Sequence, residues 1–572
     1  MNAHADPRTI SPLAVAVIRH KLKAVAEEVV ETMTRTCFSP ILNQNQDFSA
    51  VVMDGSHATI AQAERVPIHM GAMPLSVRLM HEAFGADLHD GDVLIANDPY
   101  WGGSHLPDIT MAMPLFDGGE IVMWVALRAH QDDIGGMSAG GYSGAAREIW
   151  HEGLRIPPMK LVGAGEVRED VLRLVAANSR KPAELYGDIM AQLAAVRVGR
   201  QRLAELWARY GRDEMESSVA AILRGGEATM RALLLSCREG EHRGESHLEF
   251  SGVESGLLPI PVRLRIRDGR AEIDLTEAPD QVQAFINSPI ANTRAAVLVS
   301  LLYFAGEENG LNDGSLAAID IRTRPGSLLD PREPAPVGAC TSSTACAVIE
   351  AMLRALESAD PDRAIGGFAR RFRFALAGRN EDGTPFIWHQ FFNKGGTGAS
   401  RDNDGWANIG GFHNPGGTPA PGIERTESSY PLTIEEYSLR PDSGGAGERR
   451  GGLGGSMSIR YDGAGPALLN ASGEGVHVVP FGTAGGKDGV GHLYRLERRG
   501  EAPRLIGIHD SGVAVNPGDR IVCLSAGGGG YGDPKRRAAS EIRRDVAFGY
   551  VSEAAAVETY GLGESGPAAG EG

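Results

Sequence analysis

Glycine is the residue that most constrains how this chain can fold. Its 572 residues include 75 glycines, close to twice the average share. Many of them stand in clusters after residue 390, at residues 395–396, 451–455 and 527–530. Glycine is used where a backbone turns tightly or approaches another backbone closely. Short strand-like runs such as residues 456–461 separate the clusters, so we predict a β-rich C-terminal region with many tight turns.

Earlier parts of the chain show helical and strand periodicity. Apolar spacing predicts a helix from Ser11-Pro12 to Met33 and two long helices over residues 183–210 and 214–237. Buried strands are expected over residues 93–96 and 121–127, and a β-hairpin turns at Asp268-Gly269. The predicted class is a mixed α+β, multidomain fold. Its expected domains are an N-terminal α/β region (1–163), a helical hairpin (164–245), an α/β middle domain (246–385) and a glycine-rich, β-rich C-terminal region (386–572).

Composition argues against several classes of partner. A net charge of -17 would repel a nucleic-acid backbone or an anionic membrane. The polar N-terminus and the lack of a long apolar run lead us to expect a soluble, cytoplasmic protein, and residues 563–572 are expected to be disordered. Five scattered cysteines without a Cys-x-x-Cys pair favour neither a disulfide framework nor a cysteine-rich zinc site.

One segment combines histidine and carboxylate in a metal-ligand pattern. His105 and Asp108 lie three residues apart in a Gly/Pro-rich loop, and His130 ends the next predicted strand. Such ligands suit Mn, Fe(II) or Zn and leave positions open for water and substrate. A His-Asp pair can equally be a hydrogen-bonded structural pair. The metal-site interpretation is favoured by placement at strand ends and by nearby polar residues, which are Asn97, Asp98, Asp132 and Asp133.

Longer motifs surround these residues over almost the whole chain. They are Asp-Phe-Ser (47–49), Ile-His-Met-Gly-Ala-Met (68–73), Asn-Asp-Pro-Tyr (97–100), Gly-Ser-His-Leu-Pro-Asp (103–108), Arg-Ala-His (128–130), Asp-Ile-Gly-Gly (133–136), Glu-Gly-Leu (152–154), Ile-Pro-Pro (156–158), Ile-Asn-Ser-Pro (286–289), Asp-Ser-Gly-Gly-Ala-Gly (442–447) and Gly-Gly-Gly-Gly-Tyr-Gly-Asp-Pro (527–534). In these motifs the chain resembles the hydantoinase B / oxoprolinase / acetone carboxylase alpha subunit family.

The resemblance implies a divalent metal, Mn, Zn or Fe, held by His105, Asp108 and His130. Asp47 is a weaker, fourth ligand candidate, and it could equally be a helix-cap or turn residue before Phe48.

Two further residues have two interpretations each. His69 is either a substrate or second-layer partner of the metal site or a satisfied core histidine. Asp133 either orients a ligand imidazole or acts as an acid/base, or it forms an Asx turn before Ile134.

The resemblance also implies a reaction and a partner. An A-type subunit would use ATP to phosphorylate a small cyclic amide such as hydantoin, 5-oxoproline or another lactam. This B-type chain would then hydrolyse the activated ring with metal-activated water. No glycine cluster matches the phosphate-loop pattern, so we assign ATP and Mg to the partner of a hetero-oligomer. Two alternatives are a subunit of an acetone- or acetophenone-type carboxylase and a non-catalytic scaffold.

Cys340 and Cys346 flank a predicted loop of small residues. As buried thiols they would be small apolar side chains, whereas a reactive thiolate would need a neighbouring base that the sequence does not reveal.

Overall fold

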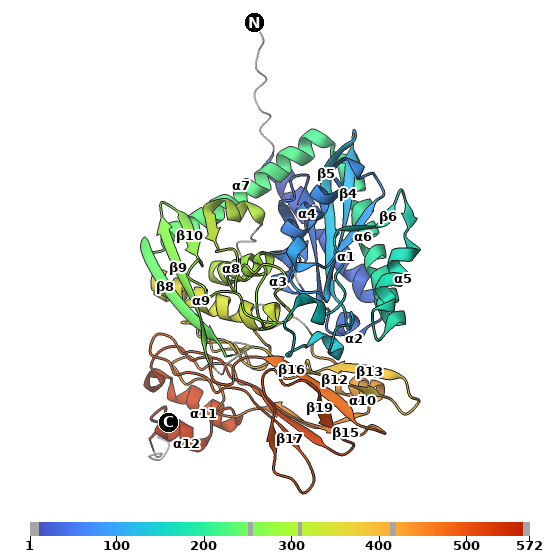
Figure 1. Ribbon diagram of the computed structural model, residues 1–572. Helices are drawn as coiled ribbons and strands as arrows, with labels where there is room; N and C mark the ends of the chain where they lie inside the picture. The colour runs from blue at the N-terminus through green and yellow to red at the C-terminus, as the bar shows by residue number, and fades with distance from the viewer. Residues whose placement is uncertain (1–10, 64, 250–255, 307–311, 412–418, 564–572) are drawn as a thin grey trace, which may run out of the picture.

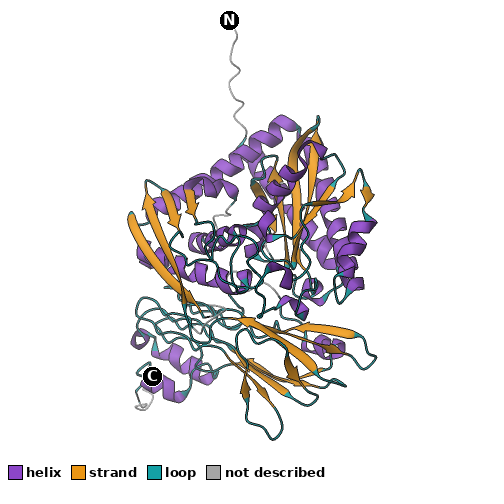
Figure 2. Ribbon diagram, viewed as in Figure 1, coloured by secondary structure: helices purple, strands orange, loops and turns teal. Residues whose placement is uncertain are grey.

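The computed structural model describes residues 11–63, 65–249, 256–306, 312–411 and 419–563 (Figure 1). Within them the chain has the mixed α+β, multidomain architecture that its sequence predicts. Three groups of elements are visible in Figure 1: a blue sheet with helices at the upper right, a green sheet with helices at the upper left, and orange-red sheets below. Figure 2 shows that the long helices belong to the two upper groups. The tail that we expected to be disordered lies outside the described residues from residue 564 on.

The N-terminal group is built on a seven-stranded sheet in the order β2-β1-β5-β4-β3-β6-β7. Its central strands are almost continuously buried because helices cover both faces. The strands predicted over residues 93–96 and 121–127 are confirmed as β3 and within β5. The strands are β1 (Phe48–Asp54), β2 (Thr59–Ala63), β3 (Val93–Ala96), β4 (Asp108–Asp117), β5 (Glu120–His130), β6 (Met159–Gly163) and β7 (Glu166–Val167).

The alternation of side chains along β1 shows how the two faces are covered. Phe48 and Val52 belong to the core shared with the helices α1 (Pro12–Thr36), α5 (Glu169–Ala177) and α6 (Pro182–Tyr210). Val51 and Met53 point to the opposite face and pack with α4 (Met73–Phe84). The predicted first helix is confirmed, with Pro12 at its first helical position.

The two long helices predicted after residue 183 are confirmed as α6 and α7 (Arg212–Ser236). Only Gly211 joins them, with φ of 77°, a conformation that glycine adopts without strain. They do not pack along each other as the hairpin that we expected. α6 packs against α1, whereas α7 crosses to the middle group and packs chiefly against η6 (Asp313–Ala318) (Figure 1). The apolar side chains explain this, because Met215 lies in the N-terminal core and Leu234 in the middle core.

The middle group has a four-stranded sheet in the order β11-β10-β9-β8, covered by α8 (Ile290–Ala305) and α9 (Ala345–Ala359). The predicted hairpin is confirmed: Asp268 and Gly269 have φ of 51° and 67°, as a type I′ turn requires. The strands are β8 (Gly240–Leu248), β9 (Leu258–Arg267), β10 (Arg270–Asp274) and β11 (Ile319–Arg322).

The C-terminal group contains two sheets, β13-β12-β16-β19 and β14-β15-β20-β17-β18, packed around an aromatic-rich core. Because β12 pairs with β16, the segment that begins this group starts before residue 386. The four predicted domain ranges stay predictions. The strands are β12 (Phe372–Arg379), β13 (Pro385–His389), β14 (Leu432–Leu439), β15 (Gly455–Tyr461), β16 (Ala467–Gly473), β17 (Leu493–Glu497), β18 (Arg504–Leu505), β19 (Val513–Val515) and β20 (Arg520–Leu524).

Glycine clusters pack backbone against backbone between these strands. The Gly528 N–H donates to the Gly452 carbonyl at 2.8 Å, and the Gly452 N–H donates to the Thr397 carbonyl at 2.9 Å. A Cβ on Gly528 would lie 1.8 Å from the Thr397 oxygen, and one on Gly396 would lie 2.0 Å from the Gly452 oxygen. Close approach of backbone segments therefore requires these glycines, as their clustering in the sequence indicates. We call this the glycine layer, consisting of residues 395–398, 443–454 and 526–530.

Cys340 and Cys346 do not flank a loop. Residues Cys340–Thr344 form one π-helical turn, η7, that leads directly into α9, and both thiols are buried. Burial raises the pKa of Cys346 to about 12 and that of Cys340 well above its ordinary value. Both side chains are therefore held as neutral thiols.

None of the described helices combines the length and the apolar character needed to cross a bilayer.

Candidate metal centre

Three of the predicted ligands come from the same edge of the N-terminal sheet. β4 begins at Asp108 and β5 ends at His130, and these two residues lie directly opposite each other across the ladder. On the other side of β5, strand β1 begins one residue after Asp47, whose carbonyl accepts the His130 N–H at 3.0 Å. Antiparallel neighbours start and end at the same edge, so residues far apart in the sequence meet there.

The donor atoms of His105, Asp108 and His130 converge on one point. His105 Nε2 lies 3.0 Å from Asp108 Oδ1 and 3.1 Å from His130 Nδ1, and the latter two atoms are 2.9 Å apart. All three residues are buried. Ligand atoms about 2.1 Å from one ion and at right angles to one another lie about 3 Å apart. The donor set thus fits a single divalent cation in both chemistry and spacing.

The backbone of the middle group orients His105. Its Nδ1 lies 2.8 Å from the Gly338 carbonyl, which accepts the Nδ1–H and leaves Nε2 free to face the other donors. Glu152 accepts the N–H groups of Val337 at 3.0 Å and Gly338 at 2.7 Å and so fixes this segment. Burial raises the pKa of Glu152 to about 8, against the lowering effect of these N–H groups.

The second carboxylate oxygen of Asp108 faces a network of buried, hydrogen-bonded side chains. Ser104 donates its hydroxyl to Asp108 Oδ2, and the guanidinium of Arg128 reaches Thr110 Oγ1 at 2.8 Å and Ser76 Oγ at 2.6 Å. Burial lowers the pKa of Arg128 to about 10, and the charge of Asp108 acts in the opposite direction. This fully buried cation compensates part of the carboxylate's charge from behind the candidate site.

His69 lies between two carboxylates and not within apolar side chains alone. On α3 (Pro67–Met70), its Nε2 is 3.5 Å from Asp108 Oδ2 and 3.8 Å from Asp47 Oδ1. Its Nδ1 has no hydrogen-bond partner among the described residues. Burial lowers the pKa of His69 despite both carboxylates. The structure therefore brings Asp47 and His69 to the same edge as the three convergent donors.

Asp133 is placed differently. Its carboxylate accepts the Gly135 N–H at 3.1 Å, which is the Asx turn considered above, and the Arg180 N–H and Nη1–H at 2.9 Å each. It also accepts the Gly140 N–H at 3.4 Å. Its oxygens thus tie the loop after β5 to the segment before α6, and its described hydrogen bonds go to no ligand imidazole.

Electrostatics favour a charged carboxylate among the donors. Burial opposes ionisation of Asp108, but His105 and His69 outweigh burial and hold its pKa well below the usual range. Burial also opposes a charged imidazole at His105, yet Asp108 raises the pKa of this ring. An anionic oxygen with imidazole nitrogens around it is the arrangement that a cation stabilises further.

Sequence reasoning missed the supporting residues Glu152, Ser104 and Arg128. Each lies in a motif quoted above, Glu-Gly-Leu, Gly-Ser-His-Leu-Pro-Asp or Arg-Ala-His. Their contacts could not be read from spacing, because Glu152 acts through a segment 185 residues away.

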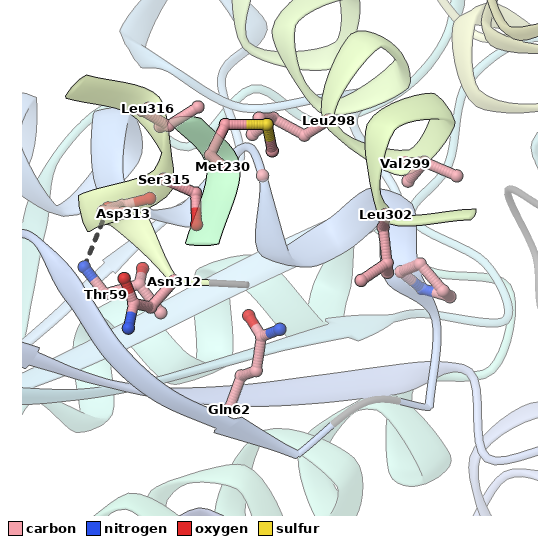
Figure 3. Close-up of a pocket in the computed structure, with 12 residues that line it drawn as sticks. Thr59, Gln62, Met230, Leu298, Val299, Leu302, Asn312, Asp313, Ser315 and Leu316 are labelled. Carbon is pink, nitrogen blue, oxygen red and sulfur yellow. Dashed lines mark hydrogen bonds between the residues drawn. The ribbon is translucent and has the colours of Figure 1, made fainter. Parts of the chain in front are cut away.

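A separate pocket lies behind α3, lined by Pro67 and Gly71 and by side chains of α7, α8 and η6 (Figure 3). Its polar wall includes Asp313, which accepts the Thr59 N–H at 2.7 Å. Burial raises the pKa of Asp313 to about 6. None of the three convergent donors lines this pocket.

Comparison with known proteins identifies the family. The family model described as Hydantoinase B/oxoprolinase matches residues 11–534. The chain belongs to this family. The caprolactamase subunit beta of Pseudomonas jessenii is 34% identical over 565 residues, which cover 97% of this chain and 96% of that protein. 5-oxoprolinase 1 of Arabidopsis thaliana is 28% identical, and the match covers 91% of this chain but 41% of that protein.

Two solved structures show the same fold. The crystal structure of ATP-dependent caprolactamase from Pseudomonas jessenii superposes with a TM-score of 0.92 at 33% identity, covering 98% of this chain and 97% of that one. A nucleotide-free acetone carboxylase structure gives a TM-score of 0.88 at 20% identity, covering 98% of this chain and 80% of the other. At that identity the second match establishes the fold alone. This hydantoinase B/oxoprolinase family member therefore has relatives that are lactam and 5-oxoproline hydrolases.

Proposed function

We propose that this chain is the B-type, metal-carrying subunit of an ATP-dependent enzyme that hydrolyses a small cyclic amide. The observation that carries the proposal is the convergence of His105 Nε2, Asp108 Oδ1 and His130 Nδ1 to within 3.1 Å of one another. Full-length similarity to a caprolactamase subunit supports lactam hydrolysis over other reactions of the fold.

His105, Asp108 and His130 would hold the metal, Mn, Zn or Fe, with Asp47 as the fourth ligand. Bound there, a divalent metal polarises a carbonyl and acidifies water. The chain's own residues prepare the site: Gly338 fixes the tautomer of His105, His105 favours the charged form of Asp108, and the Ser104 hydroxyl holds its second oxygen. Burial lowers the pKa of His69, and its Nε2 lies next to both carboxylates, where it can take up or return a proton.

The A-type partner would supply ATP chemistry. Amide resonance makes an unactivated lactam a poor electrophile, and phosphorylation of its oxygen removes that protection. Water then adds to the activated carbon and the ring C–N bond breaks, which leaves an amine and an acyl phosphate. A second water cleaves the acyl phosphate to the carboxylate and inorganic phosphate. The long 5-oxoprolinases support such a division, because this chain matches only 41% of one of them. We place the resulting hetero-oligomer in the cytoplasm, where ATP is supplied.

The test is elemental analysis of the purified chain, alone and with its A-type partner, for wild type, His105→Ala and His89→Ala. His89 is exposed and serves as the matched control. We expect near-stoichiometric Mn, Fe or Zn in wild type and His89→Ala, no metal in His105→Ala, and ATP-dependent ring opening of caprolactam, hydantoin or 5-oxoproline only with metal. A metal-free wild type with full activity would overturn the proposal.

A carboxylase is the second candidate, because acetone carboxylase shares the fold. Adding bicarbonate to the same assay separates the two. ATP turnover that requires bicarbonate and a ketone, without ring opening of any lactam, would identify a carboxylase. A complex that binds no metal and turns over neither class of substrate would leave the chain as a scaffold.

A further inference from the structure

Strand β12 presents two different faces. Phe372 and Phe374 belong to the aromatic core of the C-terminal group, whereas Ala375 faces the other way and packs with Tyr142 of the N-terminal group. By strand alternation Arg371 and Arg373 lie on the same side as Ala375. Two arginines are thus directed at the junction between the C-terminal sheet and the unit that carries the candidate metal centre.

Neither arginine has a carboxylate partner within the described ranges. Among the described residues, no ion pair involves Arg371 or Arg373. Arg373 is 6% exposed, its Nη1 has no hydrogen-bond partner in the described part of the chain, and its guanidinium stacks on Phe391 at 4.2 Å from the ring centre. Arg371 reaches the Tyr142 hydroxyl at 3.4 Å, while its buried Nε has no partner within the described ranges. Burying a cation without a counter-ion costs free energy, and a bound anion offsets this cost.

A pocket lies at these side chains. It is small, and the described residues that line it are Arg371, Phe372, Arg373, Asn393, Lys394, Gly410 and Gly411. Two arginines and one lysine are among these residues, and none of the described lining residues is acidic. The guanidinium group of arginine and the ammonium group of lysine are the side-chain groups that commonly bind phosphate in proteins.

The loop of residues 139–142 links this pocket to the metal centre. A Cβ on Gly140 would lie 2.6 Å from Ala375 Cβ, and one on Gly141 would lie 3.3 Å from Pro107 Cγ, beside Asp108. Burial and the charge of Arg371 lower the pKa of Arg373 to about 9, against Tyr142 and then Asp47. Burial and Arg373 also lower the pKa of Lys394 to about 7. Arg373 therefore interacts electrostatically with Asp47 at the edge of the candidate metal site, and Lys394 interacts with Arg373.

We propose that Arg371, Arg373 and Lys394 form an anion subsite that binds the phosphoryl group of the activated substrate next to the metal centre. This rests on the proposed function and deepens it, because it assigns a place to the group that the A-type partner would attach. The subsite would hold the phosphoryl oxygens while the carbon they activate faces the donors at the sheet edge. The same cations would bind inorganic phosphate after its release.

The test is calorimetric titration of the full-length, metal-loaded chain with inorganic phosphate, for wild type, Arg373→Gln and Arg379→Gln. Arg379 lies on the same strand, is exposed, and donates to the Gly383 carbonyl, so it is a matched control. We expect Arg373→Gln to weaken phosphate binding at least tenfold and Arg379→Gln to leave it unchanged. Equal binding by wild type and Arg373→Gln, or no binding by wild type, would overturn the proposal.

Two further arms keep the result unambiguous. His105→Ala, which is expected to lack metal, should still bind phosphate; loss of binding there would mean that phosphate binds the metal itself and not the arginines. Acetate should bind at least tenfold more weakly than phosphate, and the reverse order would replace the phosphoryl assignment with a carboxylate site. If Arg373→Gln does not fold, the less buried Arg371→Gln must show the weakening. Metal content measured on the same samples tests the proposed function separately.

Discussion

Arg370 and Arg373 stand three residues apart, and both are buried, but their surroundings differ. Arg370 Nη2 lies 2.5 Å from Glu350 Oε2, and its Nη1 lies 2.6 Å from the His247 carbonyl and 3.6 Å from Glu474 Oε2. Burial disfavours its charge, yet Glu350 raises its pKa above the ordinary value. The guanidinium of Arg373 stacks on the Phe391 ring, and burial lowers the pKa of Arg373.

The difference separates two uses of a buried cation. Arg370 precedes β12 and connects the C-terminal group to β8 and α9 of the middle group, so its charge is compensated within the chain. Arg373 lines a pocket at the junction with the metal-site unit, and compensation is left to a ligand. The comparison predicts that replacing the first arginine costs stability, whereas replacing the second costs binding.

The largest effect is expected from Arg370→Met. The substitution leaves Glu350 and Glu474 buried without their cation, and breaking a buried ion pair from one side costs about 3–5 kcal/mol. Chemical denaturation should show this loss in the free energy of unfolding. A loss below about 1 kcal/mol would mean that Arg370 is no more structural than Arg373, and the comparison would fail.

Glu474→Gln tests the same cluster through pH. Burial raises the pKa of Glu474 to about 8, although Arg370 acts to lower it. Between the unfolded pKa, about 4.3, and the folded pKa the native state keeps a proton that the unfolded state releases. Stability from this group is therefore present at low pH and is lost as pH rises toward 8. The wild type should lose on the order of 2 kcal/mol more than Glu474→Gln over this window. Parallel stability-pH curves would contradict this assignment.

Arg373→Met should change stability little, and in the opposite direction. Removing an unpaired buried cation and keeping an apolar stem is neutral or stabilising by about 1 kcal/mol. The melting temperature in phosphate-free buffer is the measurement. With phosphate added, only the wild type should gain stability, because a ligand stabilises the state that it binds. A marked destabilisation without ligand would show that Arg373 has a structural partner.

The smallest change in the free energy of unfolding is expected from Arg379→Gln. Its exposed guanidinium contacts one turn carbonyl, so the free energy of unfolding should change by less than about 0.5 kcal/mol. A larger change would show that any arginine of β12 matters to folding, which would blur the contrast between Arg370 and Arg373.

The sequence predicts what depends on local pattern. Apolar periodicity located the first helix and the two long helices, and Asp268-Gly269 located its hairpin because only certain residues tolerate positive φ. Which helices pack together was harder to predict. Each half of α7 carries apolar residues, but no local pattern indicates that the two halves enter different cores. Glycine clusters signalled close approach without saying what approaches.

In the candidate site, too, the sequence located the residues marked by local pattern but not the contacts made by distant segments. His105, Asp108 and His130 were found because loop and strand ends mark them, and the structure brings their donor atoms together. Whether they hold a metal stays a prediction. The support from Gly338 and the placement of Arg373 depend on segments more than two hundred residues away, and no local pattern encodes such contacts.

The glycine layer has a thermal consequence. Where backbone packs on backbone, unfolding exposes amide groups and very little hydrocarbon. Hydration of amides lowers the heat capacity of the unfolded chain, whereas hydration of apolar surface raises it. Per residue, this layer should therefore contribute less to the heat capacity of unfolding than the aromatic core beside it. Stability that comes from the layer would then vary more gently with temperature, and cooling would weaken it less.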